Sequence, residues 1–131
     1  MAELQPGIIG EQRVLVTEDN TAGAHGSGAV PVFSTPALVA LMEKTARLSV
    51  QPFLEPGQTT VGTRVDIRHL AATPVGTTVT ARSELTAVEG KKLVFKVEAW
   101  DGVETVGAGT HERYIVWEAS FVRKAAAKKR D

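Results

Sequence analysis

The stretch from Pro36 to Gln51 is dense in good helix formers and apolar on most of its sides. Placed at about 100° per residue, its apolar positions fall into two neighbouring stripes and leave one narrow polar ridge. The first stripe contains Leu38, Leu41, Met42, Thr45 and Ser49, the second contains Val39, Ala46 and Val50, and the ridge contains Ala40, Lys44, Arg47 and Gln51. Thr35 can cap this helix and Pro52 ends it. A helix with so little polar surface must be covered on most sides, so the pattern predicts a central helix.

Alternating apolar and polar positions predict strands before and after this helix. One strand precedes it, at 8–16, and four follow it, at 59–70, 76–88, 91–100 and 103–116. The turn dipeptides Glu89-Gly90 and Asp101-Gly102 are typical of hairpins, so the strands that they join are expected to be antiparallel. The segment 17–31 is rich in Gly and Ala without a clear period and predicts a loop or flap. The segment 119–131 is basic and predicts a frayed, solvated tail.

One strand, a long apolar helix and four further strands are the layout of an α+β hot-dog fold, in which an antiparallel sheet wraps around one central helix. The 131 residues are about one domain's worth of chain, so we expect a single domain over 1–131. An open sheet around a helix leaves edges to be covered. We therefore expect a homodimer, and leave open whether dimers pair further.

Composition argues against several classes of protein. Fifteen Lys and Arg balance fifteen Asp and Glu, so no net charge draws the chain to nucleic acid or to an anionic membrane. There are no cysteines, which excludes disulfides, thiolate metal sites and a cysteine nucleophile, and no other metal-binding pattern is present. No segment approaches the roughly 20 apolar residues of a membrane span. We expect a cytoplasmic protein without a metal.

His69 lies near the end of the strand predicted at 59–70, on the apolar face of that strand. Alternation places Val61, Thr63, Val65, Ile67 and His69 on one face, and Arg64, Asp66 and Arg68 on the other. An inward histidine near a strand end can be a core residue that bonds a backbone carbonyl. It can also be a general base or a general acid. The pattern leaves both interpretations open.

Two residues of the helix segment are further candidates. Glu43 lies in the second apolar stripe, where a carboxylate either reaches solvent or a Lys or Arg partner, or belongs to a functional site. Thr35 has the ordinary role of a cap, but a helix start also concentrates N–H donors that stabilise developing negative charge. The two lie eight residues apart, a rise of about 12 Å along a helix. A site that uses both is more easily built across a dimer, or with substrate or water between them.

Five stretches of the chain share their order and nearly their spacing with one protein family, from about residue 30 to about 117. They are VFST (32–35), LVALME (38–43), FLEPGQ (53–58), VGTRVDIRHLAATPVGTTVT (61–80) and GAGTHER (107–113). HLAATPVG joined to GTHER is the most specific combination among them. Together the stretches resemble the hot-dog thioesterases related to fluoroacetyl-CoA thioesterase.

The resemblance implies a set of site residues. In that family a threonine, a glutamate and a histidine form the catalytic set, and they fall on Thr35, Glu43 and His69. The resemblance also implies a substrate-contacting backbone N–H at Gly62 and a substrate-pocket arginine at Arg113. Without it, Gly62 is interpreted as a strand bulge and Arg113 as an exposed strand charge.

The reaction that the resemblance implies is hydrolysis of an acyl-CoA to free acid and CoA, with no cofactor beyond the CoA of the substrate. His69 is expected to act as general base or acid, and Glu43 as nucleophile or as activator of water. Thr35 is expected to orient or stabilise the reacting carbonyl, with a nucleophilic role left open. The N–H of Gly62 would bind the carbonyl oxygen.

The segment before Thr35 departs from the family pattern. In the fluoroacetyl-specific enzyme it is longer and carries phenylalanines that close the pocket as a lid, whereas TAGAHGSGAVP (21–31) has no aromatic residue. A small, flexible flap gives little shape discrimination, so we expect a broader thioesterase for short or small acyl groups rather than fluoroacetyl specificity. His25 in this flap is expected to be solvated, and the alternative is a contact with the substrate. The alternatives are a hot-dog acyl-CoA hydratase or dehydratase, and a non-catalytic module that binds acyl-CoA or a small ligand.

Overall fold

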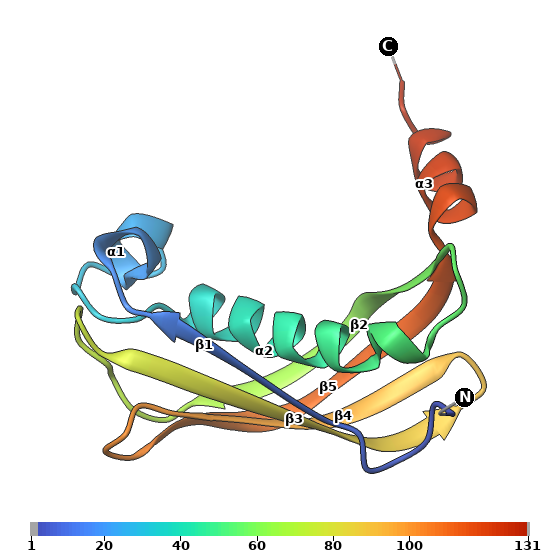
Figure 1. The fold of residues 1–131 in the computed structure, drawn as a ribbon. Coiled ribbons are helices and arrows are strands. Elements are labelled where there is room, and N and C mark those ends of the chain that lie inside the picture. The colour runs from blue at the N-terminus through green and yellow to red at the C-terminus, as the bar shows by residue number, and fades with distance from the viewer. Residues whose placement is uncertain (1–2, 131) are drawn as a thin grey trace.

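A long helix, α2 (Thr35–Val50), lies across the concave face of a five-stranded antiparallel sheet in the computed structural model, which describes residues 3–130 (Figure 1). The strands are β1 (Ile9–Leu15), β2 (Gln58–His69), β3 (Thr78–Glu89), β4 (Lys92–Trp100) and β5 (Thr105–Trp117). Their order across the sheet is β1-β3-β4-β5-β2, so β1 and β2 are the two edges. The predicted α+β hot-dog arrangement is confirmed, and the ends of the predicted elements shift by only one or two residues.

Ser34, and not Thr35, caps the start of α2. The Ser34 Oγ accepts a hydrogen bond from the backbone N–H of Ala37 at 3.0 Å, and Thr35 is the first residue of the helix itself. The predicted capping role of Thr35 is therefore wrong. Because Ser34 satisfies the helix end, the Thr35 hydroxyl is free to bond another partner.

The first turns of α2 approach the sheet closely at Gly107 of β5. A Cβ atom at Gly107 would lie 2.7 Å from Leu38 Cδ2 and 3.2 Å from Met42 Cε, so only glycine leaves room for these two buried side chains. Burial of each such side chain contributes about 1.5–3 kcal/mol to folding. Gly107 pairs with His69 across the β2–β5 ladder. The same close approach therefore places the start of α2 next to the end of β2.

A β-bulge interrupts β2 where it pairs with β5. Gly62 pairs with Arg113 and Arg64 pairs with Glu112, so Thr63 is an extra residue that pairs with no residue of β5. A Cβ atom at Gly62 would point into the Glu43 carboxylate of α2, which shows that Gly62 faces the helix. The face predicted for the first half of this strand is wrong, because the prediction assumed unbroken alternation.

Short helices lie where the sequence predicts only a flap and a frayed tail. The segment after β1 forms η1 (Glu18–Asn20) and α1 (Ala22–His25), and η2 (Gln51–Phe53) follows α2. The tail forms α3 (Glu118–Ala126), whose residues are all at least partly exposed and which projects away from the sheet (Figure 1). Alanines, an acidic first turn and a basic last turn favour this helix. No helix within residues 3–130 is long and apolar enough to cross a membrane.

Candidate active site

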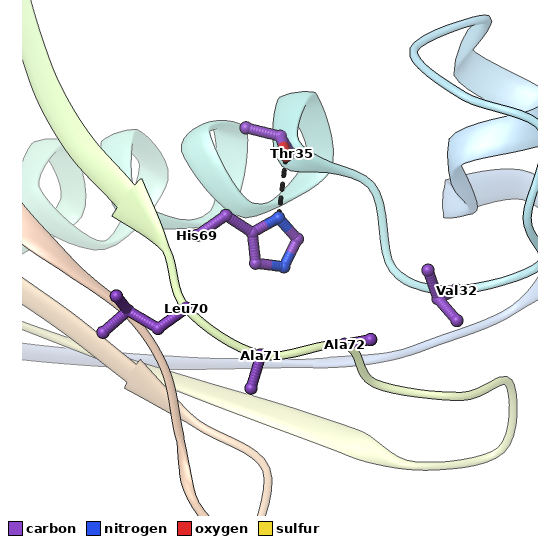
Figure 2. A pocket seen from close by; sticks show the side chains of 6 residues that line it. All are labelled: Val32, Thr35, His69, Leu70, Ala71 and Ala72. Carbon is purple, nitrogen blue, oxygen red and sulfur yellow. Dashed lines mark hydrogen bonds between the residues drawn. The ribbon is translucent and has the colours of Figure 1, made fainter.

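Thr35 and His69 form a hydrogen-bonded pair between the start of α2 and the end of β2. The Thr35 Oγ1 lies 2.7 Å from the His69 Nδ1, and Figure 2 shows the other ring nitrogen turned away from this bond. That nitrogen, Nε2, is buried and has no hydrogen-bond partner within residues 3–130. The pair borders an open cavity of about 310 Å³, lined by Val32, Thr35, His69, Leu70, Ala71 and Ala72. The second nitrogen of His69 thus lies beside the cavity without a partner among the described residues, but it is covered in this structure, so a ligand reaches it only after a small shift of the ring or of the atoms over it.

Burial lowers the pKa of His69 below its usual value of 6.5, so the ring is neutral at neutral pH. A neutral imidazole carries its proton on one nitrogen only. If the Thr35 hydroxyl donates to Nδ1, then Nε2 carries the proton and can donate it. If Nδ1 donates to Thr35, then Nε2 is a free base. The geometry therefore permits both the acid and the base role predicted for His69.

Glu43, Gly62 and Arg113 form a second group farther along the same helix. The Glu43 Oε2 lies 3.7 Å from the Arg113 Nη1, and 38% of the Glu43 side chain is exposed. A Cβ atom at Gly62 would lie 2.5 Å from the same carboxylate oxygen, so the carboxylate occupies the space that this glycine leaves open. The arginine partner that the sequence offered for Glu43 is therefore present, and the functional role of Glu43 stays a prediction. The carboxylate end of this ion pair is partly exposed, whereas the guanidinium end is buried.

Arg113 is buried, not an exposed strand charge, and three hydrogen bonds fix its guanidinium. Its Nε donates to Thr60 Oγ1 at 2.7 Å and its Nη2 donates to the Thr60 carbonyl at 2.8 Å. Its Nη1 lies 3.2 Å from the His111 Nε2. Burial lowers the pKa of Arg113, while the Glu43 carboxylate opposes that shift. Because these three hydrogen bonds fix the planar guanidinium, its remaining N–H donors point in a fixed direction.

Sequence reasoning missed Thr60 and His111. Thr60 lies two residues before Gly62, and His111 lies two residues before Arg113, so each shares a strand face with a predicted site residue. That spacing could have identified both as neighbours of the site. His111 belongs to the GTHER stretch, yet no role was inferred for it.

The five predicted site residues form two groups, not one. The first group is Thr35, at the start of α2, with His69, at the end of β2. The second group is Glu43 of α2 with Gly62 of β2 and Arg113 of β5. Thr35 and Glu43 are separated by two turns of α2, a rise of about 12 Å. Within one protomer a small reacting group cannot touch both groups at once.

His25 lies in α1, away from the cavity beside His69. It is exposed, but its Nδ1 makes a hydrogen bond with the Ser34 Oγ at 2.5 Å. The expectation of a simply solvated histidine is therefore incomplete, because the ring bonds the residue that caps α2. The contact ties the short helix of the flap to the start of the long one.

Comparisons with known proteins find similar sequences and similar folds. The family model described as fluoroacetyl-CoA-specific thioesterase (FlK) matches residues 16–119. The fluoroacetyl-CoA thioesterase of Streptantibioticus cattleyicolor is 44% identical over 97 residues, which are 74% of this chain and 70% of that protein. The solved structure of fluoroacetyl-CoA thioesterase FlK is 35% identical, with a TM-score of 0.92 over 98% of this chain and all of that one. A variant of FlK in complex with acetyl-CoA has a TM-score of 0.92 at 34% identity, over 97% of this chain and 100% of the other.

Proposed function

The chain belongs to the fluoroacetyl-CoA-specific thioesterase (FlK) family of hot-dog acyl-CoA thioesterases, and we propose that its own substrates are acyl-CoAs with a short or small acyl group. The products are the free acid and CoA. One observation carries the proposal: His69 bonds Thr35 through one nitrogen and turns its other, unpartnered nitrogen toward an open cavity. A histidine placed in this way can move a proton to or from a bound thioester.

The lining of the cavity supports a broad preference for small acyl groups. Its apolar side chains are Val32, Leu70, Ala71 and Ala72, and the residues that line it include no Phe, Tyr or Trp. The flap at 21–31 also carries no Phe, Tyr or Trp that could close over a bound acyl group. Aliphatic walls of this kind discriminate weakly between acyl groups of similar size, so fluoroacetyl specificity is not part of the proposal.

Each site residue has a distinct role in the proposed reaction. Glu43 attacks the thioester carbonyl or activates the water that does, and the Gly62 N–H and Thr35 stabilise the oxygen on which charge develops. When water attacks, His69 takes up its proton and returns it to the sulfur of CoA as the C–S bond breaks. When Glu43 attacks, its carboxylate carries no proton, so the sulfur takes the proton of His69, and the water that hydrolyses the resulting anhydride restores it. Arg113 fixes a polar group of the substrate or the Glu43 carboxylate itself. No cofactor beyond the CoA of the substrate takes part.

A homodimer formed through the β2 edges brings the two groups of site residues together. The strand has a neighbour on one side only, and residues 62–66 and 68 are exposed. Two β2 strands related by a two-fold axis run antiparallel, so the His69 end of one lies against the Gly62 end of the other. Each complete site then combines Thr35 and His69 of one protomer with Glu43 of the partner subunit. The cytoplasmic location expected from the sequence stays a prediction.

The first test is thiol release from a panel of acyl-CoAs. Acetyl-CoA and other short acyl-CoAs are expected to release CoA, and the rate for fluoroacetyl-CoA should lie within about tenfold of that for acetyl-CoA, because the cavity offers no specific contact to fluorine. Hydration of an enoyl-CoA without thiol release would favour the hydratase. Binding of acyl-CoA with neither reaction would favour the non-catalytic module. A fluoroacetyl-CoA rate many hundred times the acetyl-CoA rate would contradict broad specificity.

The second test is the pH profile of kcat/KM for the best substrate. Protonation of His69 removes the base, so kcat/KM should fall as pH decreases through the pKa of the free enzyme. Because burial lowers the pKa of His69, the midpoint of this fall is expected below 6.5. The Thr35 side chain that bonds the ring carries no charge, and the backbone of Ala71 raises the pKa of His69 by less than burial lowers it. A midpoint clearly above 6.5 would contradict the assignment of His69 as the base.

A further inference from the structure

We propose that His111 is a positioning residue for the hydrolysis: it orients the Arg113 guanidinium and, through it, the Glu43 carboxylate. The inference rests on the proposed function of Glu43 and Arg113. His111 is 1% exposed and its ring stacks on Phe95, with ring centroids 6.1 Å apart. It therefore reaches neither solvent nor the cavity beside His69, and it acts on the reaction only through its neighbours.

One hydrogen bond fixes which nitrogen of His111 carries the proton. The Nδ1 lies 2.8 Å from the backbone carbonyl oxygen of Arg64. A carbonyl oxygen only accepts, so Nδ1 must be the donor. Burial lowers the pKa of His111, and the nearby Arg113 charge lowers it further, although the Arg64 carbonyl and the Glu43 and Glu112 carboxylates oppose this. The ring is then neutral, and Nε2 carries a lone pair and no hydrogen.

The Nε2 of this tautomer accepts a hydrogen bond from the Arg113 Nη1 at 3.2 Å. Thr60 accepts from the Nε and the Nη2 of the same guanidinium. An arginine has five N–H groups, so these three bonds leave one N–H on each terminal nitrogen. The free N–H of Nη1 belongs to the atom that lies 3.7 Å from the Glu43 Oε2. Loss of the His111 bond would leave the planar guanidinium held by Thr60 alone, so the whole group could tilt and carry Nη1 away from the carboxylate.

The same histidine connects Arg113 to the β-bulge. Arg64, whose carbonyl accepts from Nδ1, follows the extra residue of the bulge, and Gly62 precedes that residue. The His111 Cε1 would lie 3.3 Å from a Cβ atom at Gly62. His111 therefore contacts the bulge through one nitrogen and Arg113 through the other. Two substitutions can separate these contacts, because each retains only one of them.

His111→Gln places an amide oxygen near the position of Nε2 and retains an acceptor for Arg113, whereas His111→Asn places an amide N–H near Nδ1 and retains only the donor to Arg64. We expect His111→Gln to keep kcat within about threefold of wild type and His111→Asn to lower it about 10- to 100-fold, the usual effect of one hydrogen bond to a charged group. Each variant loses one bond and the ring stacking, so their melting temperatures should be similar. The reverse order of activity, or equal activity, would overturn the proposal and leave His111 as a support of the bulge.

An Arg113→Lys background tests whether His111 acts through Arg113. Lysine has no planar fork to align, so His111→Asn should cost nothing further in that background. A second loss of the same size there would contradict the proposal. Crystal structures of the two His111 variants give a readout independent of turnover: the Arg113 Nη1 to Glu43 Oε2 distance should stay near 3.7 Å in His111→Gln and lengthen in His111→Asn. Wild-type inactivity on every acyl-CoA would refute the proposed function, whereas an unchanged distance in both variants would refute the positioning role.

Discussion

Replacement of His69 by alanine is expected to lower kcat for acyl-CoA hydrolysis by about 10²- to 10⁴-fold, the usual contribution of a positioned general acid or base. The folded protein loses only one side-chain hydrogen bond, between His69 and Thr35, at a cost of about 1 kcal/mol. Each tenfold loss of rate corresponds to about 1.4 kcal/mol of transition-state stabilisation. The expected effect on the reaction is therefore several times the effect on stability.

His25→Ala is the matched control for this substitution. His25 is exposed and also makes one side-chain hydrogen bond, to Ser34, but it lies outside the cavity lining. Steady-state kinetics and thermal unfolding of both variants should show similar small changes in melting temperature and a large loss of kcat only for His69→Ala. Equal loss of activity in both variants, or unfolding of His69→Ala, would mean that His69 is a structural core residue.

Mixed dimers of two inactive variants are expected to regain activity. His69→Ala and Glu43→Gln should each be nearly inactive as homodimers. In a heterodimer that joins them, one site combines the two substituted residues, and the other combines an intact His69 with the partner subunit's intact Glu43. Random mixing gives about half heterodimers with one working site each, so about one quarter of wild-type activity should return.

The experiment requires co-expression with two different affinity tags and purification of the heterodimer. Activity per heterodimer should then approach half that of the wild-type dimer. Homodimers of each variant, carried through the same steps, are the control for residual activity. A heterodimer as inactive as its parents would contradict a site shared between protomers, and an active monomeric wild type in solution would contradict the dimer itself.

The sequence predicts the features of this fold that depend on local pattern. The helical period identifies α2, and alternation in the second half of β2 places His69 on the helix side, where it meets Thr35. The resemblance, and not the residues alone, supplied the reaction, because period and spacing carry no information about bond chemistry. The family is now shown by the comparisons, while the roles of the individual residues stay predictions.

The features that the sequence did not predict depend on contacts between distant segments. Whether β2 contains a bulge is decided by its register with β5, which lies about 50 residues later in the chain. The burial of Arg113 depends on acceptors from Thr60 and His111, and neither strand alone reveals it. The helical tail α3 is different, because its alanines and charge order were visible and the prediction gave them too little weight.

The bulge in β2 also makes the number of residues between Gly62 and His69 important. Gly62 and His69 are seven positions apart, an odd number, and in an uninterrupted strand two such positions face opposite sides of the sheet. Both face α2 because the unpaired Thr63 adds one residue that does not count in the alternation, so the number of alternating positions from Gly62 to His69 is even. Insertion or deletion of one residue between Gly62 and His69 would therefore turn one of the two away from α2, whereas insertion or deletion of two residues would leave both facing it. The number of residues between Gly62 and His69, as well as their identity, is part of what defines the site.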